Sequence, residues 1–378
     1  MAITTRSNST AQARAVIFED VETFVVRPVA LPPIGPDDML VEVLLCGVDG
    51  SELHMYRGEL PWFNERVPII FGDEIIGRVA QIGASAAQQR GMKVGDRVTI
   101  EARWPCDRCR CCAEGQYYLC ENNPDGRGYG TISMDEAPGL WGGYATHVFV
   151  PKQALAYPVP EELTLEAALV SCSLLANSLA WVRQAELKRG GTLVVIGPGP
   201  QGIGCALVAA HHGAKVVVLG LERDADRLAF AESLSPSISA VVARPEDDSK
   251  VTIEKVLGIL GEVDVVIEAA GVPSAKELAF ALVRRTGRVL QVSIPFPHVQ
   301  SVDWQNALMK ELTILNPVSH PHAVKPALEL GLELARHGID VGRFVSHRFG
   351  LDDAAEAIEV ASYRRSDSPI KVVLDPAM

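Results

Sequence analysis

The sequence predicts an α/β protein with two domains, the first rich in short β-strands and the second built on a doubly wound parallel sheet. Its 378 residues exceed the usual length of one domain. In the first part of the chain, short apolar runs are separated by Pro and Gly residues. From about Pro160 onward, apolar strand-like runs alternate with helical stretches, and this alternation predicts a parallel sheet with right-handed crossovers.

The strand and helix signals can be placed along the chain in order. In residues 1–160, the expected first domain, we predict strands at Ala15–Phe18, Leu40–Leu45 and Arg97–Ile100. In residues 161–318, the expected second domain, we predict helices at Leu165–Leu187 and Ile203–His212 and strands at Thr192–Ile196, Lys215–Leu219, Asp264–Ile267 and Arg288–Val292. We expect residues 319–378 to return to the first domain, with helices at Ala323–His337 and Asp352–Ser362 and a strand at Ile370–Leu374.

The overall composition limits the kinds of partner. The formal net charge is -12, which argues against nucleic acid because phosphate binding needs a basic surface. A local positive site for an anionic cofactor remains compatible with this charge. No uninterrupted apolar run approaches the ~20 residues of a membrane span. The polar segment Met1–Gln12 lacks the apolar core of a secretory signal and predicts a loose tail, so we expect a cytoplasmic protein without a membrane partner.

A glycine-rich segment between a predicted strand and a predicted helix indicates a dinucleotide site. Residues 197–202, Gly-Pro-Gly-Pro-Gln-Gly, fit the pattern G-x-G-x-x-G. The glycines let the backbone approach a pyrophosphate, and the free N–H groups and dipole of the helix attract its charge. We therefore predict that Gly197, Gly199, Gln201 and Gly202 bind the cofactor; the alternative is a glycine-rich turn without a ligand.

The end of the next strand bears on the choice between NAD and NADP. An acidic residue that binds the adenosine ribose is expected there, but the strand ends in Gly220. Gly220 would leave room for a 2′-phosphate, and Arg223 could pair with it. Arg227 lies nearby and is also predicted to bind the cofactor. Glu222 would repel the phosphate or bind the ribose from a shifted position. The alternative is that these side chains face solvent, and the balance slightly favours NAD.

Four cysteines have the spacing of a structural metal site. They follow C-x2-C-x2-C-x7-C, which suits a closed tetrahedral zinc site, and are Cys106, Cys109, Cys112 and Cys120. Cys111 breaks the spacing and is expected not to bind. Clustered cysteines in a chain of this size indicate metal ligands rather than a disulfide framework, although a loop of unliganded thiols is the alternative.

Together these motifs resemble the medium-chain dehydrogenase/reductase family, in its zinc-containing alcohol and polyol dehydrogenase branch. The likeness extends from about Arg14 to Pro376 and includes Gly-Asp-Glu-Ile-Ile-Gly at 72–77, Val-Gly-Asp-Arg-Val at 94–98, Gly-Gly-Tyr-Ala at 142–145 and Ile-Lys-Val-Val-Leu at 370–374. The resemblance implies a GroES-like catalytic domain packed on a Rossmann domain, an active site between them for a small-molecule substrate, and a homodimer or homotetramer. It also adds Lys371 to the predicted cofactor-binding residues.

The sequence departs from the family at the ligands of the catalytic zinc. Asp49 stands where the family has Cys, Asp73 stands where it has His, and Cys172 matches the third position. A metal held by Asp49, Asp73 and Cys172, with Glu74 nearby, would have an anionic shell that weakens it as a Lewis acid and admits harder ions. Without a metal, the crowded carboxyl groups would keep at least one proton, and a neutral carboxyl can polarise a carbonyl. Both alternatives are compatible with the sequence.

Ser51 and His54 match the family's proton relay, in which a hydroxyl passes the substrate proton to an imidazole. The alternatives are a turn cap for Ser51 and a surface role for His54. We predict hydride transfer between a nicotinamide cofactor and an alcohol or ketone, including polyol-like substrates. The second hypothesis is a reductase of an activated C=C or C=N bond that needs no catalytic metal, and the third is a non-catalytic dinucleotide-binding sensor or scaffold.

Overall fold

The computed structural model describes residues 11–60, 63, 65–122, 128–244, 248–362 and 368–378. The chain forms two compact units. Unit 1 comprises Met1–Leu169, Val345–Arg365 and Lys371–Met378, and unit 2 comprises Val170–Phe344 and Ser366–Ile370. Most of the predicted N-terminal tail lies outside the described residues.

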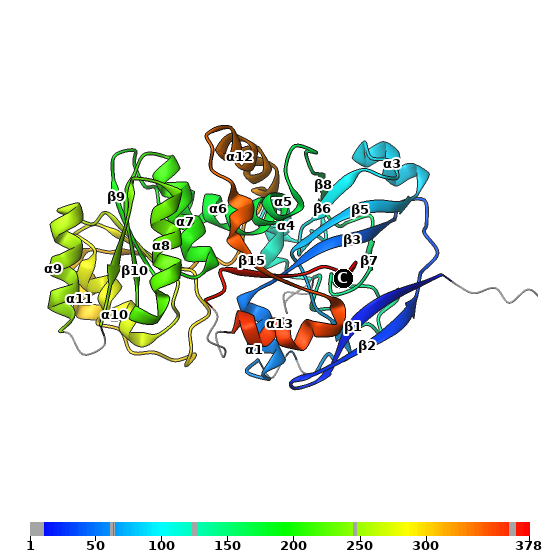
Figure 1. Cartoon of the computed structure of the whole chain (residues 1–378), viewed down its shortest axis with the longest axis horizontal. Coiled ribbons are helices and arrows are strands. Elements are labelled where there is room, and N and C mark those ends of the chain that lie inside the picture. Colours follow the sequence, from blue (N-terminus) through cyan, green and yellow to red (C-terminus); the bar gives the residue numbers. More distant parts are fainter. Residues whose placement is uncertain (1–10, 61–62, 64, 123–127, 245–247, 363–367) are drawn as a thin grey trace, which may run out of the picture. The chain divides into compact units, whose positions relative to one another are not determined.

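Unit 1 is the β-rich part that the sequence predicted. Its elements are β1 (Gln12–Asp20), β2 (Thr23–Ala30), β3 (Met39–Val48), α1 (Gly50–Tyr56), β4 (Ile69–Ile70), β5 (Ile75–Ile82), α3 (Ala84–Arg90), β6 (Arg97–Ile100), α4 (Arg110–Ala113), η1 (Tyr117–Leu119), β7 (His147–Val150), β8 (Ala156–Pro158), α5 (Leu165–Val170), β15 (Val345–Phe349), η5 (Leu351–Asp353), α13 (Ala354–Ala361) and β16 (Lys371–Leu374) (Figure 1). α5 ends at the boundary with unit 2.

Two sheets enclose the core of unit 1. One has the strand order β15-β16-β3-β5-β6-β8 with β7 on β3, and the other has the order β2-β1-β4. Strand β3 pairs antiparallel with both β5 and β16. Because antiparallel neighbours begin where β3 ends, the residues after β3 lie beside those that start β5 and β16. This register places three residues at the same end of these strands: Asp49, Glu74 and Lys371.

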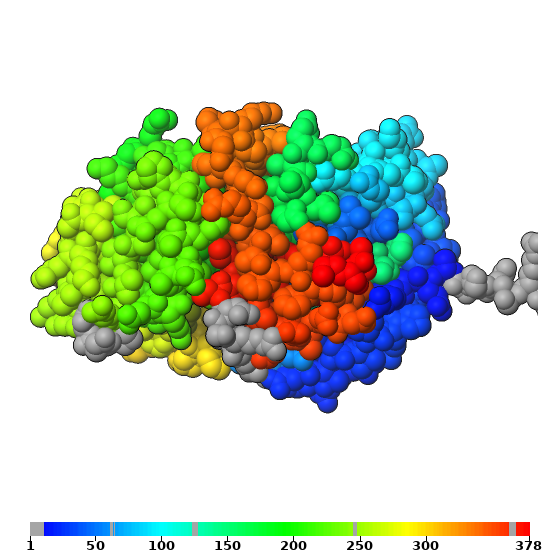
Figure 2. All heavy atoms as spheres, in the orientation of Figure 1, coloured from blue at the N-terminus to red at the C-terminus, as the bar shows by residue number. Residues whose placement is uncertain are grey.

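The C-terminal residues complete unit 1. β16 pairs parallel with β15, and the Asp375 N–H donates to the Phe349 carbonyl at 2.8 Å. In Figure 2 the last residues, in red, lie on the surface beside the orange segment that includes α13.

Unit 2 is the alternating part of the chain. Its elements are η2 (Ser171–Leu175), α6 (Ala176–Gln184), β9 (Thr192–Ile196), α7 (Pro200–His211), β10 (Lys215–Gly220), η3 (Glu222–Asp224), α8 (Ala225–Leu234), β11 (Ile238–Val242), α9 (Ser249–Leu260), β12 (Val265–Glu268), α10 (Pro273–Leu282), β13 (Arg288–Gln291), α11 (Trp304–Lys310), β14 (Thr313–Leu315), α12 (Val324–Arg336) and η4 (Val341–Phe344).

The sheet of unit 2 has the order β11-β10-β9-β12-β13-β14, and every pair is parallel. Its buried strands are rich in Val, Leu and Ile, as expected when helices cover a parallel sheet. The predicted α/β fold and the four strands predicted here are confirmed, whereas β11 and β14 were not predicted. The chain leaves β9 in one direction for β10 and β11 and later returns for β12, so β9 and β12 flank the point at which strand order reverses.

The unit boundaries differ from those predicted at residues 160 and 318. Residues 319–344 belong to unit 2 because α12 packs against η2 and α6. The helical stretch Leu165–Gln184 is long and apolar enough for a membrane span by length and composition, although polar residues interrupt its apolar run. However, 78% of its apolar window is buried inside the protein, as in the core helix of a folded domain.

Candidate active site

The glycine-rich turn has the geometry that a dinucleotide requires. Gly197 follows β9 with φ of +103°, and an added Cβ would lie 3.0 Å from Ala270 N. Gly199 is the N-cap of α7, and no heavy atom lies within 4 Å of an added Cβ. At Gly202 an added Cβ would collide with the Gly197 carbonyl oxygen and Val195. The first and third glycines therefore serve the tight turn and the helix–strand packing, and the second leaves the helix N-terminus open to a ligand.

Gln201 is a second, independent observation that fits a ligand at this turn. Its Oε1 atom is shielded from solvent and accepts no hydrogen bond from the residues that the structure describes. Buried polar atoms without partners are uncommon, and a ligand often satisfies them. The turn lies at the carboxyl end of β9, at the reversal of strand order where open α/β sheets bind ligands. These residues therefore fit a dinucleotide.

The turn after β10 is tightly packed. The space beside Gly220 is filled, because an added Cβ would lie 2.8 Å from Pro198 Cγ and 3.1 Å from Asp224 Cβ. Arg227 is buried, with its guanidinium group donating to Asp224 Oδ1 at 3.1 Å and to the Pro369 carbonyl at 3.1 Å. The Cβ position at Gly220 is thus crowded and the Arg227 guanidinium is paired inside unit 2, and the contact of either residue with the cofactor stays a prediction.

Two of the predicted adenosine-side residues remain accessible. Glu222 and Arg223 are both exposed on η3, directly after β10. Arg227 is thus paired inside the unit, whereas Glu222 and Arg223, which are adjacent in the sequence, remain accessible to a ligand.

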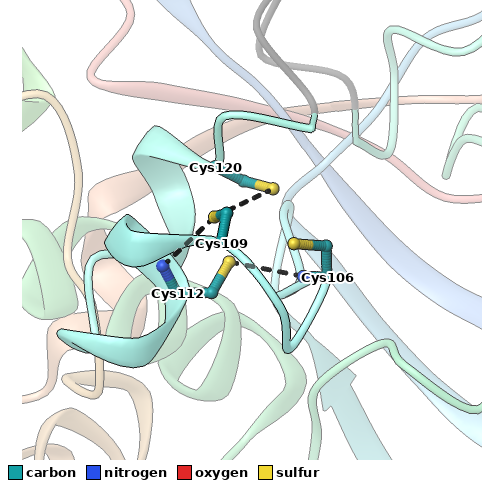
Figure 3. Close-up of side chains that lie close together, drawn as sticks. All are labelled: Cys106, Cys109, Cys112 and Cys120. Carbon is teal, nitrogen blue, oxygen red and sulfur yellow. Dashed lines mark hydrogen bonds between the residues drawn. The ribbon is translucent and has the colours of Figure 1, made fainter.

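The four predicted zinc ligands converge in unit 1. Their Sγ atoms all lie within 4.8 Å of one another, and Figure 3 shows Cys106, Cys109, Cys112 and Cys120 facing a common point. The Cys112 N–H donates to Cys109 Sγ at 3.4 Å, and the Cys106 N–H donates to Cys112 Sγ at 3.3 Å. The Asn122 amide donates to Cys106 Sγ and lowers the pKa of this thiol to about 6. Four thiols in this arrangement fit a closed structural zinc site.

Cys111 stays outside this group, as expected. Its Sγ atom lies 3.7 Å from Glu121 Oε1, and burial raises the pKa of its thiol. Cys111 is therefore not one of the four thiols whose Sγ atoms lie close together.

At the second predicted site, Asp49 is the N-cap of α1. Its Oδ1 atom accepts hydrogen bonds from the Glu52 N–H at 3.0 Å and from the Ser51 hydroxyl at 2.8 Å. The Glu52 carboxylate accepts the Asp49 N–H in return, which completes a capping box. Asp49 and Ser51 are therefore brought together as predicted, with a helix-capping role for the carboxylate.

Glu52 is a site residue that sequence reasoning missed. It is 2% exposed and also accepts the Gly72 N–H at 2.8 Å and the Tyr144 hydroxyl at 2.6 Å. Burial, together with the charges of Asp49 and Asp73, raises the pKa of Glu52 well above its usual range. Its place in the sequence, three residues after an Asp at a helix start, was the signal for the capping box.

The remaining carboxyl groups meet two basic residues. Glu74 and Lys371 form an ion pair in which both side chains are buried, and the Lys371 ammonium group also donates to the Val48 carbonyl at 2.8 Å. Burial, followed by the charges of Asp49 and Glu74, raises the pKa of Asp73 well above its usual range. The charges of Arg103 and Lys371 act in the opposite direction on Asp73. Sequence reasoning missed Arg103.

These residues do not fit the catalytic zinc of the family. Two of the three ligand positions carry carboxylates, whereas zinc favours Cys and His. Asp49 is engaged as a helix cap, and Glu74 is paired with Lys371. Among the described residues, the four cysteines of the lobe are the one group of three or more Cys, His, Asp or Glu whose donor atoms lie this close together. Cys172, the third predicted ligand, is buried on η2 of unit 2.

The two members of the predicted relay have different partners. Ser51 donates to Asp49, and His54 Nδ1 lies 2.5 Å from Glu59 Oε2. The His54 side chain is 26% exposed, at the end of α1. The structure thus places both residues on one short helix, and their cooperation stays a prediction.

Comparisons with known proteins agree with this architecture. Residues 35–161 match the model of the alcohol dehydrogenase GroES-like domain, and residues 200–333 match that of the zinc-binding dehydrogenase. A Mycobacterium tuberculosis protein named as a probable alcohol dehydrogenase is 38% identical over 283 residues, which cover 74% of this chain and 75% of the relative. A D-arabitol-phosphate dehydrogenase of Enterococcus avium is 29% identical, with 87% of this chain and 88% of the relative covered.

Solved structures give the same result. The alcohol dehydrogenase TADH from Thermus sp. ATN1 has a TM-score of 0.79 at 28% identity, covering 96% of this chain and 99% of its own. A candidate zinc-binding dehydrogenase from Sinorhizobium meliloti 1021, solved bound to NADP, has a TM-score of 0.81 at 29% identity, covering 97% and 100%. The fold and the two sites thus define a zinc-binding, nicotinamide-dependent oxidoreductase. The chain belongs to the alcohol dehydrogenase family whose GroES-like and zinc-binding dehydrogenase domains it contains.

Proposed function

We propose that this protein transfers hydride between a nicotinamide cofactor and an alcohol or ketone, with polyol-like molecules as the substrate class. The observation that carries the proposal is the open Gly199 at the N-terminus of α7, at the point where strand order reverses. Relatives named as sorbitol dehydrogenase and D-arabitol-phosphate dehydrogenase support a polyol-like substrate.

The residues of the altered pocket would handle the substrate oxygen and its proton. When bound, the cofactor supplies or accepts a hydride at C4 of its nicotinamide ring. The raised pKa of Asp73 favours a neutral carboxyl, which can donate a hydrogen bond to a carbonyl oxygen. Ser51 and His54 lie on the same helix as the Asp49 cap and are the candidates for moving the proton to solvent.

We propose NAD as the preferred cofactor by a small margin. With Arg227 buried and the space beside Gly220 filled, Arg223 is the predicted basic residue that remains exposed for a 2′-phosphate. The neighbouring Glu222 repels a phosphate and can accept hydrogen bonds from a ribose. Lys371 is a weak candidate for binding the cofactor, because its ammonium group is already paired with Glu74.

The edge of the sheet in unit 2 supports the expected homo-oligomer. In the described part of the chain, β14 pairs with β13 alone, and large apolar side chains in the segment that precedes β14 are exposed. They include Val299 at 88%, Leu308 at 77% and Trp304 at 63%. An exposed strand edge beside apolar side chains favours association, so we propose that a second copy of the chain covers it. The net charge of -12 argues against a nucleic acid partner. We also propose a cytoplasmic location without a membrane partner, because the long apolar stretch Leu165–Gln184 is mostly buried inside the protein.

The proposal is tested by measuring reduced nicotinamide with NAD⁺ and NADP⁺ over a panel of polyols and simple alcohols. The wild type should turn over at least one compound. Gly199→Val should abolish cofactor binding while the protein stays folded, because the added side chain enters the open space of the turn. Gly258→Val is the matched control, since an added Cβ at Gly258 also meets nothing within 4 Å. Undiminished cofactor binding by Gly199→Val would contradict the proposed site.

Reduction of a panel of activated alkenes and imines distinguishes the second hypothesis. Turnover restricted to such compounds would replace the alcohol or ketone as substrate. Cofactor binding without turnover in either panel would favour a dinucleotide sensor.

A further inference from the structure

Glu268, the last residue of β12, is a carboxylate without a role in the sites described above. It is 0% exposed. Its Oε1 atom accepts the N–H groups of Ala270 and Gly271, each at 2.7 Å. Its Oε2 atom accepts the Ser293 hydroxyl at 3.0 Å. A fully buried carboxylate is costly unless hydrogen bonds compensate it, and here three neutral donors do so.

These hydrogen bonds join two loops at the carboxyl end of the sheet. Ala270 and Gly271 follow β12, and Ser293 follows the neighbouring strand β13. Gly271 receives further bonds at its carbonyl, from the Phe296 N–H at 3.0 Å and from the Gln300 side chain at 2.9 Å. The Glu268 carboxylate and the Gly271 carbonyl therefore link the two loops, and the carboxylate is the charged group among these links.

The first of these loops also touches the glycine-rich turn. An added Cβ on Gly197 would lie 3.0 Å from Ala270 N, and the Ala269 N–H donates to the Ile196 carbonyl at 2.8 Å. The loops after β9, β12 and β13 thus lie together at the reversal of strand order. In a doubly wound sheet, the pyrophosphate sits on the turn after the first strand and the bound molecule crosses this reversal.

From this arrangement we propose that Glu268 is a positioning residue for the nicotinamide half of the cofactor. It holds the backbone N–H groups of Ala270 and Gly271 and the hydroxyl of Ser293 where the cofactor crosses from β9 to β12. The adenosine half lies on the other side of the turn, near η3, and is independent of Glu268. This proposal rests on the proposed function, because it requires that the turn binds a nicotinamide dinucleotide.

The effect can be separated from general stability by comparing two ligands. NADH contains the nicotinamide half, whereas ADP-ribose lacks it and retains the pyrophosphate and adenosine. Glu268→Ala should weaken NADH binding by at least about tenfold, the order expected for losing hydrogen bonds to a charged group, and leave the dissociation constant of ADP-ribose nearly unchanged.

Two further variants provide controls. In Glu268→Gln, the amide oxygen can still accept both N–H groups and the amide nitrogen can donate to the Ser293 oxygen, so NADH binding should be retained within about threefold. Ser293→Ala removes one of the three hydrogen bonds and should have an intermediate effect. This variant also keeps the test valid if Glu268→Ala does not fold.

The experiment is calorimetric titration of wild type, Glu268→Ala, Glu268→Gln and Ser293→Ala with NADH and with ADP-ribose, at a temperature well below the melting point of each. Selective loss of NADH affinity in the alanine variants, with rescue by Gln, supports the proposal. Equal weakening of both ligands, or no change in either, would overturn it. A wild type that binds neither ligand would instead contradict the proposed function.

Discussion

Lys371 at the start of β16 forms a buried ion pair with Glu74, directly before β5. Strand β3 pairs with both β16 and β5, and this pairing brings Lys371 and Glu74 to the end of β3 that continues into Asp49. Basic and acidic side chains thus meet where the family has its catalytic zinc ligands. The side chains at this end of the strands form an ion pair and a helix cap, which differ from the ligands of a metal site. The strands that position them are nevertheless those of the family.

Breaking the pair should destabilise the protein strongly. Lys371→Met leaves the Glu74 carboxylate buried without its cation, which should lower the free energy of unfolding by about 3–5 kcal/mol. The double variant Lys371→Met/Glu74→Gln should recover part of this loss because it removes the unpaired charge. Urea unfolding measures both effects. The control is Lys152→Met, whose ion pair with Asp37 lies at the surface and should contribute far less to stability. A loss in Lys371→Met no larger than that of the control would contradict the account.

The raised pKa of Asp73 predicts a pH dependence of stability. Because the folded state holds this proton more tightly than the unfolded state, stability should fall as the pH rises from the usual carboxyl range through the raised pKa. Asp73→Asn removes the titrating group, so its melting temperature should fall less steeply with pH and should exceed that of the wild type at pH 7. Melting curves recorded between about pH 4 and pH 8 cover the usual carboxyl range and the pH values above it. They measure how steeply the melting temperature of each protein falls with pH. Parallel curves for the two proteins would exclude the effect.

Features that involve residues close together in the sequence could be predicted, whereas features that join distant residues could not. The glycine-rich turn and β9 are local signals, and the four-cysteine spacing is local as well. The capping role of Asp49 was also readable, because Glu52 stands three residues later. The pairing of Lys371 with Glu74 depends on strand register and could not be read from the sequence.

Two further features were missed for the same reason. The partners of the Arg227 guanidinium, Asp224 and the Pro369 carbonyl, are set by the fold. The helical pattern of α12 showed an apolar face but not the surface it covers, and so the return to unit 1 was placed too early. The strand β14 has three residues, and Ser239 and Ala240 interrupt the apolar run of β11, so neither strand was recognised.

Zinc binding should stabilise the lobe through Cys109. Cys109→Ser should lose the lobe's zinc and lower the melting temperature by several degrees, because a closed structural zinc site contributes to folding. Cys111→Ser is the matched control, since Cys111 lies in the same loop but outside the converging group. Metal analysis and thermal melting of the two variants test this. Equal behaviour of the variants would show that the converging thiols are not the ligands.

The exposed turn after β10 should tune cofactor choice. Glu222→Ala removes a negative charge beside Arg223 and should shift the preference toward NADP, through weaker repulsion of the 2′-phosphate. Arg223→Ala should shift it the other way. The ratio of kcat/KM for the two cofactors measures the change. A ratio unmoved by either substitution would show that this turn does not meet the ribose.

The most direct test is the zinc content per subunit of wild-type protein purified without added zinc. The four-cysteine lobe fits zinc, whereas the cluster formed by Asp49, Asp73 and the Lys371–Glu74 pair does not. The expected result is one zinc per subunit, which is lost in Cys109→Ser and unchanged in Asp49→Asn. Two zinc ions per subunit, one of them lost in Asp49→Asn, would contradict the account, because the altered ligand positions would then hold a metal after all.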